Sequence, residues 1–585
     1  MVSAALNGLR RWTLRQLQPV YEELADEERM DEERKEEELS ESSLSSLSSS
    51  NSSAPEYAPG GQRELSPATT AFRLITFIPI LTVRLLHTGL VFLTEPARRR
   101  ASRFQTGWPP IHDKLGFLIV FVPSFLQPSG PGSARKLHPS AWLDGLRGIA
   151  AFLVVWHHAS LLWFSWSIHR GYGSSENDNR LIQLPFLRLV VSGRPQVAIF
   201  FVVSGYALSY KPLKLARQGR HSEAGEAIHS SVFRRHPRLF IMPVVVSFVA
   251  ALMTQWNWYG TSDQGWTGVA APVRRPPRPG TLSRQLLNWA LNVKYLTSPL
   301  SRDMQRGRPF AYDNNLWTLP VEFDCSLVIF LCQAAFCRLR PQVRMLLMAG
   351  IVCYAHSYLF WEIFLFSGGM LLCDLHFHLD GTGSSGSSSS NTASEAAVPP
   401  VISARNRRQL RNAVSIFSFA TALFILSIPD DNQGGPHTPG YRTLFSMVTD
   451  VYRLRNERDN FWIPPAAVLL VWTIDRTPFL QRPFNSAFAQ FLGTISYSMY
   501  LVHGPLIWTA GHWLVCHTTA LTGTDTDFRY GLGIALSALV LWPIIIYLAD
   551  LVTRTVDVRA VSFGRWLYER WVVKEPEPII TRPIS

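Results

Sequence analysis

The sequence predicts an all-α protein that crosses a membrane many times. Hydrophobic residues make up 47% of the chain and charged residues only 17%, a balance that is unusual for soluble domains. The hydrophobic residues are gathered into separate blocks, and many of these approach the roughly 20 residues that span a bilayer as a helix. Together, these two observations favour a multipass membrane helical bundle over a string of soluble domains.

From Trp142 onward we expect about ten core transmembrane helices. Several of the apolar blocks are shorter than the ideal span of about 20 residues. Their approximate ranges are 143–165, 195–210, 237–256, 317–337, 343–359, 360–376, 413–428, 461–474, 488–511 and 531–552.

The remaining segments suggest how the chain is divided. Residues 1–66 are acidic and then Ser-rich, a composition typical of disorder, and residues 67–139 hold apolar stretches that we expect to be amphipathic or re-entrant, with a linker. The transmembrane domain covers residues 140–552. It is interrupted by a flexible loop at 377–412 that contains the run GTGSSGSSSSN. Residues 553–585 are predicted to be a cytosolic tail.

The positive charge of the chain predicts its orientation in the membrane. The net charge is +13, but the basic residues lie mostly between apolar blocks, where the positive-inside rule puts them, so we exclude a nucleic-acid partner. With a cytosolic N-terminus, every predicted inside loop is basic, and the C-terminus is cytosolic too. An internal membrane such as the endoplasmic reticulum is the expected location.

Six scattered cysteines predict neither a disulfide framework nor a metal site.

The first core span, LDGLRGIAAFLVVWHHAS, carries the clearest candidate site residues. Arg147 and His158 are eleven residues apart, which in a helix is three turns plus roughly 20° and a rise of roughly 16 Å, so they share one face. Asp144 falls within about 40° of the same stripe, whereas His157 is rotated by about 100°. Ionisable groups inside a membrane are costly and often functional. The alternatives are a structural histidine and a snorkelling arginine at the membrane surface.

Two further spans place titratable groups at a similar depth. Glu322 lies near the start of the fourth span, in NNLWTLPVEFDC, and His503 lies well inside the ninth, in ISYSMYLVHGPL, together with Tyr497 as a further candidate. A buried histidine near a carboxylate suits a general base that takes a proton from a hydroxyl, with the carboxylate orienting the imidazole. We therefore expect His158 and Glu322 to be catalytic.

Three arginines lie around the start of the third span, in FRRHPRLF. Arg234, Arg235 and Arg238 lie at its predicted cytosolic edge, where they are either topology anchors or a site for the phosphates of a nucleotide-bearing co-substrate. Earlier in the chain, Ser204-Gly205 is interpreted as a close helix-packing site rather than a catalytic serine.

Six segments in order resemble the signature of the acyltransferase 3 family of integral membrane acyltransferases. They are LDGLRGIAAFLVVWHHA, FFVVSGYALS, FRRHPRLFIMP, NNLWTLPVEF, FLFSGGMLL and ISYSMYLVHGPL, and the likeness covers roughly residues 140 to 552. The family's basic residue, followed by ten other residues and then a histidine, maps onto Arg147 and His158, and its glutamate maps onto Glu322. The acidic N-terminal region and long loops are similar to the fungal branch, whose members often modify secondary metabolites.

The resemblance implies transfer of an acyl group, commonly acetyl from cytosolic acyl-CoA, to a hydroxyl of a small molecule or glycan. The acyl-CoA would be a co-substrate meeting Arg147 and the three arginines, with no permanently bound cofactor and with membrane lipid as the surroundings. The alternative is a proton-coupled secondary transporter, in which buried His and Glu relay protons. Such transporters often have two similar halves, and no repeat is found between the parts before and after residues 377–412. A non-catalytic scaffold would leave the buried charges without a purpose.

Overall fold

The computed structural model describes residues 123–124, 137–164, 168–259, 275–298, 310–384 and 404–573. The chain divides into two compact units, residues 1–103 and 104–585, and all the described residues belong to the second. The predictions for residues 1–66, for most of 67–139 and for the end of the tail lie outside these ranges. Within them the protein is helical and contains no strand, as the sequence predicted.

Each of the predicted apolar blocks coincides with a helix. The longer helices are α4 (Ala141–Phe164), α5 (Gly193–Arg217), α6 (His221–Gln255), α7 (Leu282–Thr297), α9 (Thr318–Phe336), α10 (Pro341–Ser357), α11 (Trp361–Ser384), α12 (Ala404–Leu426), α15 (Asp459–Asp475), α17 (Ala487–Leu506), α18 (His512–Thr522), α19 (Asp527–Val552) and α20 (Val558–Trp571). Three short helices are α13 (Arg442–Ser446), α14 (Asp450–Leu454) and α16 (Pro478–Gln481).

Five helical stretches among the described residues are long and apolar enough to cross a membrane. They are Ala141–Phe164, His221–Gln255, Asn314–Phe336, Arg408–Leu426 and Asp527–Trp571. Such helices support an integral membrane protein, because a long apolar helix satisfies its own backbone hydrogen bonds in lipid. The helices α10 and α15 have 17 residues each, short of the roughly 20 needed for a span. The count of about ten therefore stays a prediction.

Several helices run past the boundaries that the apolar blocks suggested. Helix α6 begins at His221, so its arginines lie in mid-helix. Helix α11 continues to Ser384 and α12 begins at Ala404, which shortens the predicted loop. Helix α19 passes through a π-helical turn, Thr553–Asp557, into α20, so residues 553–571 of the predicted tail are helical. A polar segment after an apolar block can either continue the helix or form a loop. The amino-acid composition of the segment alone does not show which of the two it does.

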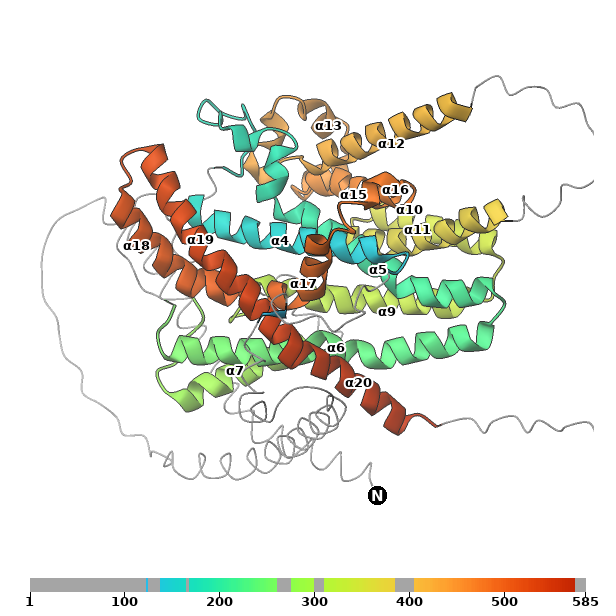
Figure 1. Ribbon diagram of the computed structural model, residues 1–585, viewed down its shortest axis with the longest axis horizontal. Coiled ribbons are helices and arrows are strands. Elements are labelled where there is room, and N and C mark those ends of the chain that lie inside the picture. The colour runs from blue at the N-terminus through green and yellow to red at the C-terminus, as the bar shows by residue number, and fades with distance from the viewer. Residues whose placement is uncertain are drawn as a thin grey trace, which may run out of the picture. The chain divides into compact units, whose positions relative to one another are not determined.

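Glycines let the helices that surround the candidate site approach closely. A Cβ on Gly148 of α4 would lie 2.3 Å from the backbone nitrogen of Gly493 in α17. A Cβ on Gly205 of α5 would lie 2.1 Å from the carbonyl oxygen of Phe366 in α11. The prediction of close helix packing at Gly205 is therefore confirmed. Helices α4, α5, α6, α9 and α11 run beside one another (Figure 1).

The substitution Gly205→Ala is expected to destabilise the protein by about 1–3 kcal/mol, because the added methyl group forces α5 and α11 apart. Gly350 of α10 is the matched control, since a Cβ there would meet nothing within 4 Å. Gly350→Ala should leave the thermal midpoint unchanged or raise it, because alanine favours a helix over glycine. Thermal unfolding in detergent, followed by tryptophan fluorescence, measures both. Equal midpoints for the two variants would contradict close packing at Gly205.

Candidate active site

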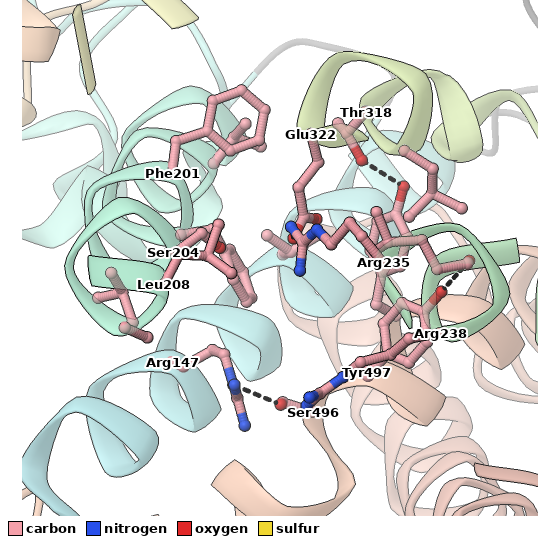
Figure 2. Close-up of a pocket in the computed structure, with 18 of the residues that line it drawn as sticks. Arg147, Phe201, Ser204, Leu208, Arg235, Arg238, Thr318, Glu322, Ser496 and Tyr497 are labelled. Carbon is pink, nitrogen blue, oxygen red and sulfur yellow. Dashed lines mark hydrogen bonds and ion pairs between the residues drawn. The ribbon is translucent and has the colours of Figure 1, made fainter. Parts of the chain in front are cut away.

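A cavity of about 290 Å³ lies between α4, α5, α6, α9 and α17. Its charged lining residues are Arg147, Arg235, Arg238, Glu322 and Asp557, three cations against two carboxylates. Figure 2 shows the side chains converging from different helices, with Ser204 and Leu208 of α5 facing Arg235 of α6 across the space. Most of the remaining lining is apolar or carries a hydroxyl group. The cavity thus combines a basic wall with an apolar one.

Arg147 is fixed to α17 by its guanidinium group. Its Nε donates to Ser496 Oγ at 3.1 Å and its Nη2 to the Gly493 carbonyl oxygen at 3.1 Å. Asp144, one turn earlier on α4, pairs with the same guanidinium at 3.2 Å. The Asp144 side chain is 59% exposed and is not among the residues that line the cavity. Asp144 therefore meets the candidate site only through Arg147.

Arg235 and Glu322 form a partly buried ion pair across α6 and α9. Arg235 Nη2 lies 2.8 Å from Glu322 Oε1, and its Nε donates to Ser326 Oγ at 2.9 Å. The expected contact between Glu322 and His158 was wrong, because the structure pairs this carboxylate with Arg235. A charge-assisted bond to a guanidinium is a strong interaction for a carboxylate. Glu322 therefore fixes a cation in the wall of the cavity.

The other two arginines of α6 point in different directions. Arg238 is exposed and lines the cavity, and among the described residues it has no hydrogen bond or ion pair. Arg234 instead donates to the Ser230 carbonyl oxygen at 3.0 Å and lies close to Arg565 of α20. Of the three arginines predicted as a phosphate site, Arg235 and Arg238 face the cavity and Arg234 does not.

His158 and His503 come together next to the cavity. Their ring centroids are 5.2 Å apart, and His503 is fully buried. Neither ring lines the cavity, but Val154, one turn before His158 on α4, and Tyr500, one turn before His503 on α17, both do. Arg147 and His158 both contact α17, as side chains on one helix face should. The histidine pair therefore lies one helical turn from cavity-lining residues on both α4 and α17.

His157 has a different environment from its neighbour. Its Nδ1 lies 2.6 Å from the carbonyl oxygen of Val191, in the 3₁₀-helix Leu187–Val191. The His158 ring has no hydrogen bond among the described residues and touches the rings of His157 and His503. A ring already bound to a backbone carbonyl is a structural histidine, whereas a ring with free nitrogen atoms can exchange a proton with a substrate.

Comparison with known proteins decides between an enzyme and a transporter. Residues 140–548 match the model of an acyltransferase domain family. The chain belongs to this acyltransferase family. It is 40% identical over 493 residues to the O-acetyltransferase PaAT-1 of Phomopsis amygdali, covering 83% of this chain and 95% of that protein. The transporter alternative is therefore not favoured. No solved structure matches the chain.

Two more distant relatives are also fungal acyltransferases. Acyltransferase R4 of a Phoma species is 23% identical over 448 residues, which cover 69% of this chain and 91% of that protein. Acyltransferase clz18 of Cochliobolus lunatus is 21% identical over 458 residues, which cover 72% of this chain and 93% of that protein. The similarity thus extends over nearly the whole length of each relative.

Some residues of the acyltransferase cavity were not predicted from the sequence. Tyr500 shares a hydrogen bond with Thr318 at 2.7 Å, and the spacing of Ser496, Tyr500 and His503 could have placed all three on one face of α17. Tyr497, which was a candidate, also lines the cavity and donates to the Leu239 carbonyl oxygen at 2.5 Å. Asp557 lies in the segment predicted as a tail, where no sequence signal connects it with the cavity.

Proposed function

We propose that this acyltransferase is a membrane-embedded O-acetyltransferase that moves an acetyl group from acetyl-CoA to a hydroxyl of a small molecule, such as a secondary metabolite, or of a glycan. The observation that carries the proposal is the arrangement of Arg147, Arg235 and Arg238 around one cavity, with His158 one helical turn beyond the lining residue Val154. The relative at 40% identity is an O-acetyltransferase, which supports acetyl as the transferred group.

The basic wall of the cavity suits the phosphate groups of acyl-CoA. Guanidinium groups bind phosphate oxygens through paired, charge-assisted hydrogen bonds. Arg238 has a free guanidinium group for this purpose, and Arg235 is held in place by Glu322 at 2.8 Å. In this account, Arg147 and Arg238 bind phosphates together with Arg235, and Glu322 is a positioning residue for Arg235.

The apolar wall suits the pantetheine arm and a short acyl group. The residues on this wall include Val197, Phe200, Phe201 and Leu208 of α5. The volume of about 290 Å³ is at the low end of the range of roughly 300–1,000 Å³ for small-molecule sites. Once the arm is bound, little space is left for a long acyl chain, which supports an acetyl donor.

His158 is the proposed general base. Its free ring nitrogen takes the proton from the acceptor hydroxyl while that oxygen attacks the thioester carbonyl carbon. The C–S bond breaks, an ester forms, and the proton passes from His158 to the sulfur of the leaving CoA. The enzyme ends the cycle unchanged, so the reaction needs no metal or redox partner in this account.

The same proposal includes the orientation of the protein. We place the arginine end of the cavity and both termini on the cytosolic side of an internal membrane such as the endoplasmic reticulum. The basic composition of the predicted inside loops supports this orientation. Acetyl-CoA would then enter from the cytosol.

Product analysis tests the proposed function. Purified protein in lipid nanodiscs is given acetyl-CoA labelled in the acetyl group and a panel of alcohols, and ester products are measured by mass spectrometry. We expect an ester one acetyl group heavier than its alcohol, and less product from butanoyl-CoA and palmitoyl-CoA. Faster transfer from palmitoyl-CoA than from acetyl-CoA would contradict a short acyl donor. Labelled acceptor accumulating unmodified inside sealed vesicles would point back to transport.

A further inference from the structure

His503 is completely buried, yet each of its two ring nitrogens has a hydrogen-bond partner. Its Nδ1 lies 3.2 Å from the carbonyl oxygen of Met499, one turn earlier on α17. Its Nε2 lies 3.3 Å from the side-chain nitrogen of Asn315. The ring face meets His158 at a centroid distance of 5.2 Å. Both ring nitrogens therefore have a partner while the face of the ring contacts the proposed base.

The backbone N–H and the backbone carbonyl oxygen of Asn315 are both hydrogen-bonded. It lies in the 3₁₀-helix Asn314–Trp317 that precedes α9 and is 6% exposed. Its backbone N–H donates to Asp313 Oδ1 at 2.9 Å, and its carbonyl oxygen accepts a bond from the Tyr500 hydroxyl. The backbone of Asn315 is therefore fixed, and its side-chain nitrogen lies 3.3 Å from His503 Nε2.

These contacts determine which nitrogen of His503 carries the proton. A backbone carbonyl oxygen can only accept, so the nitrogen facing Met499 must be the N–H. In a neutral ring, Nε2 then offers a lone pair, and the Asn315 amide N–H₂ is the donor that it needs. The orientation of an asparagine amide is assigned from its hydrogen bonds. Here the Met499 carbonyl places the proton on Nδ1 of His503, so the Asn315 amide must turn its N–H₂ group toward Nε2.

We propose that Asn315 is a positioning residue that acts through His503, holding this histidine as a neutral ring of fixed orientation against His158. This inference rests on the proposed role of His158 as the base. A neutral neighbour lets His158 become positively charged when it takes the substrate proton, whereas a protonated His503 would oppose that charge. The titratable groups around His503 are His158 and His157 from α4, Tyr500 from α17 and Asp313 from the segment before α9.

The first test is Asn315→Ala, with Asn314→Ala as the matched control. Asn314 is the preceding residue in the same 3₁₀-helix and is exposed. We expect Asn315→Ala to lower kcat about tenfold or more while KM for acetyl-CoA stays within about twofold, because the phosphate-binding arginines are untouched. Asn314→Ala should match the wild type. An unchanged kcat in Asn315→Ala, or a rise in KM alone, would overturn the inference.

A second variant separates positioning from simple packing. In Asn315→Asp a carboxylate replaces the amide, and it favours a proton on His503 Nε2. We expect kcat at least about tenfold below the wild type at pH 7, with the gap closing toward pH 9 as the ring loses that proton. A loss that is the same at every pH would mean that Asn315 only fills space, and it would overturn the proposal.

A double-mutant cycle shows whether the effect passes through His503. His503→Phe keeps the ring volume but has no nitrogen to bind. In this background, Asn315→Ala should lower kcat no further, and a full additional loss would contradict the coupling. His158→Ala is measured alongside. If His158→Ala remains active, the proposed base is wrong; if it is inactive and Asn315→Ala is normal, only the positioning role fails.

Discussion

Replacing His158 with alanine is expected to lower kcat for acetyl transfer by roughly 10²–10⁴-fold, the usual contribution of a general base. The His158 ring has no hydrogen bond among the described residues and lies one turn beyond Val154, which lines the cavity. Among the described residues, no other histidine without a hydrogen bond on its ring contacts His503. Initial rates of ester formation, at saturating acetyl-CoA and with protein amounts matched, give the comparison.

The neighbouring histidine supplies the control for this prediction. His157 Nδ1 lies 2.6 Å from the Val191 carbonyl oxygen, so His157→Asn keeps a donor near the same place. Its kcat should stay within about threefold of the wild type, because a lost structural contact affects folding more than the chemical step. Equal losses of kcat in the two variants would remove the reason for assigning the base to His158.

Replacing Arg238 with alanine is expected to raise KM for acetyl-CoA by about 10–100-fold with a smaller change in kcat. A hydrogen bond to a charged group contributes about 1.5–3 kcal/mol, which corresponds to that range. Arg238 lines the cavity and has no hydrogen bond or ion pair among the described residues, and the Asp557 carboxylate that it faces also interacts with Arg147. Binding of acetyl-CoA measured by calorimetry should weaken by the same factor.

Arg234 is the matched control for Arg238. It lies on the same helix and carries the same charge, but it donates to the Ser230 carbonyl oxygen at 3.0 Å and is not a cavity residue. Arg234→Ala should leave KM within about threefold of the wild type. If Arg234→Ala and Arg238→Ala raised KM equally, the effect would come from the general positive charge of α6 and not from a phosphate site.

The helical period predicted what lies on a single helix. Arg147 and His158 were expected on one face of the first span, and both contact α17 in the structure. Apolar block length likewise predicted the helices themselves, since each block lies on a helix. These predictions succeed because they depend on local geometry, which a sequence contains.

Contacts between helices were harder to predict. Glu322 was expected to orient His158 because both are titratable and at similar depth, but its partner is Arg235 at 2.8 Å. Depth along a helix does not say which neighbour a side chain faces. The pairing of His158 with His503 and the approach of Asp557 to the cavity depend on how α4, α17 and the turn after α19 pack. Packing of this kind follows from the whole bundle and not from any one segment.

The most direct test of this account is a cryo-electron microscopy structure of the protein in nanodiscs with a non-hydrolysable acetyl-CoA analogue. We predict phosphate oxygens within about 2.7–3.2 Å of guanidinium nitrogens of Arg235 or Arg238. The acetyl carbonyl should point toward His158, leaving space for an acceptor oxygen within about 3–3.5 Å of both the carbonyl carbon and the ring. An analogue bound outside the cavity, or one whose acetyl group points away from His158, would contradict the account.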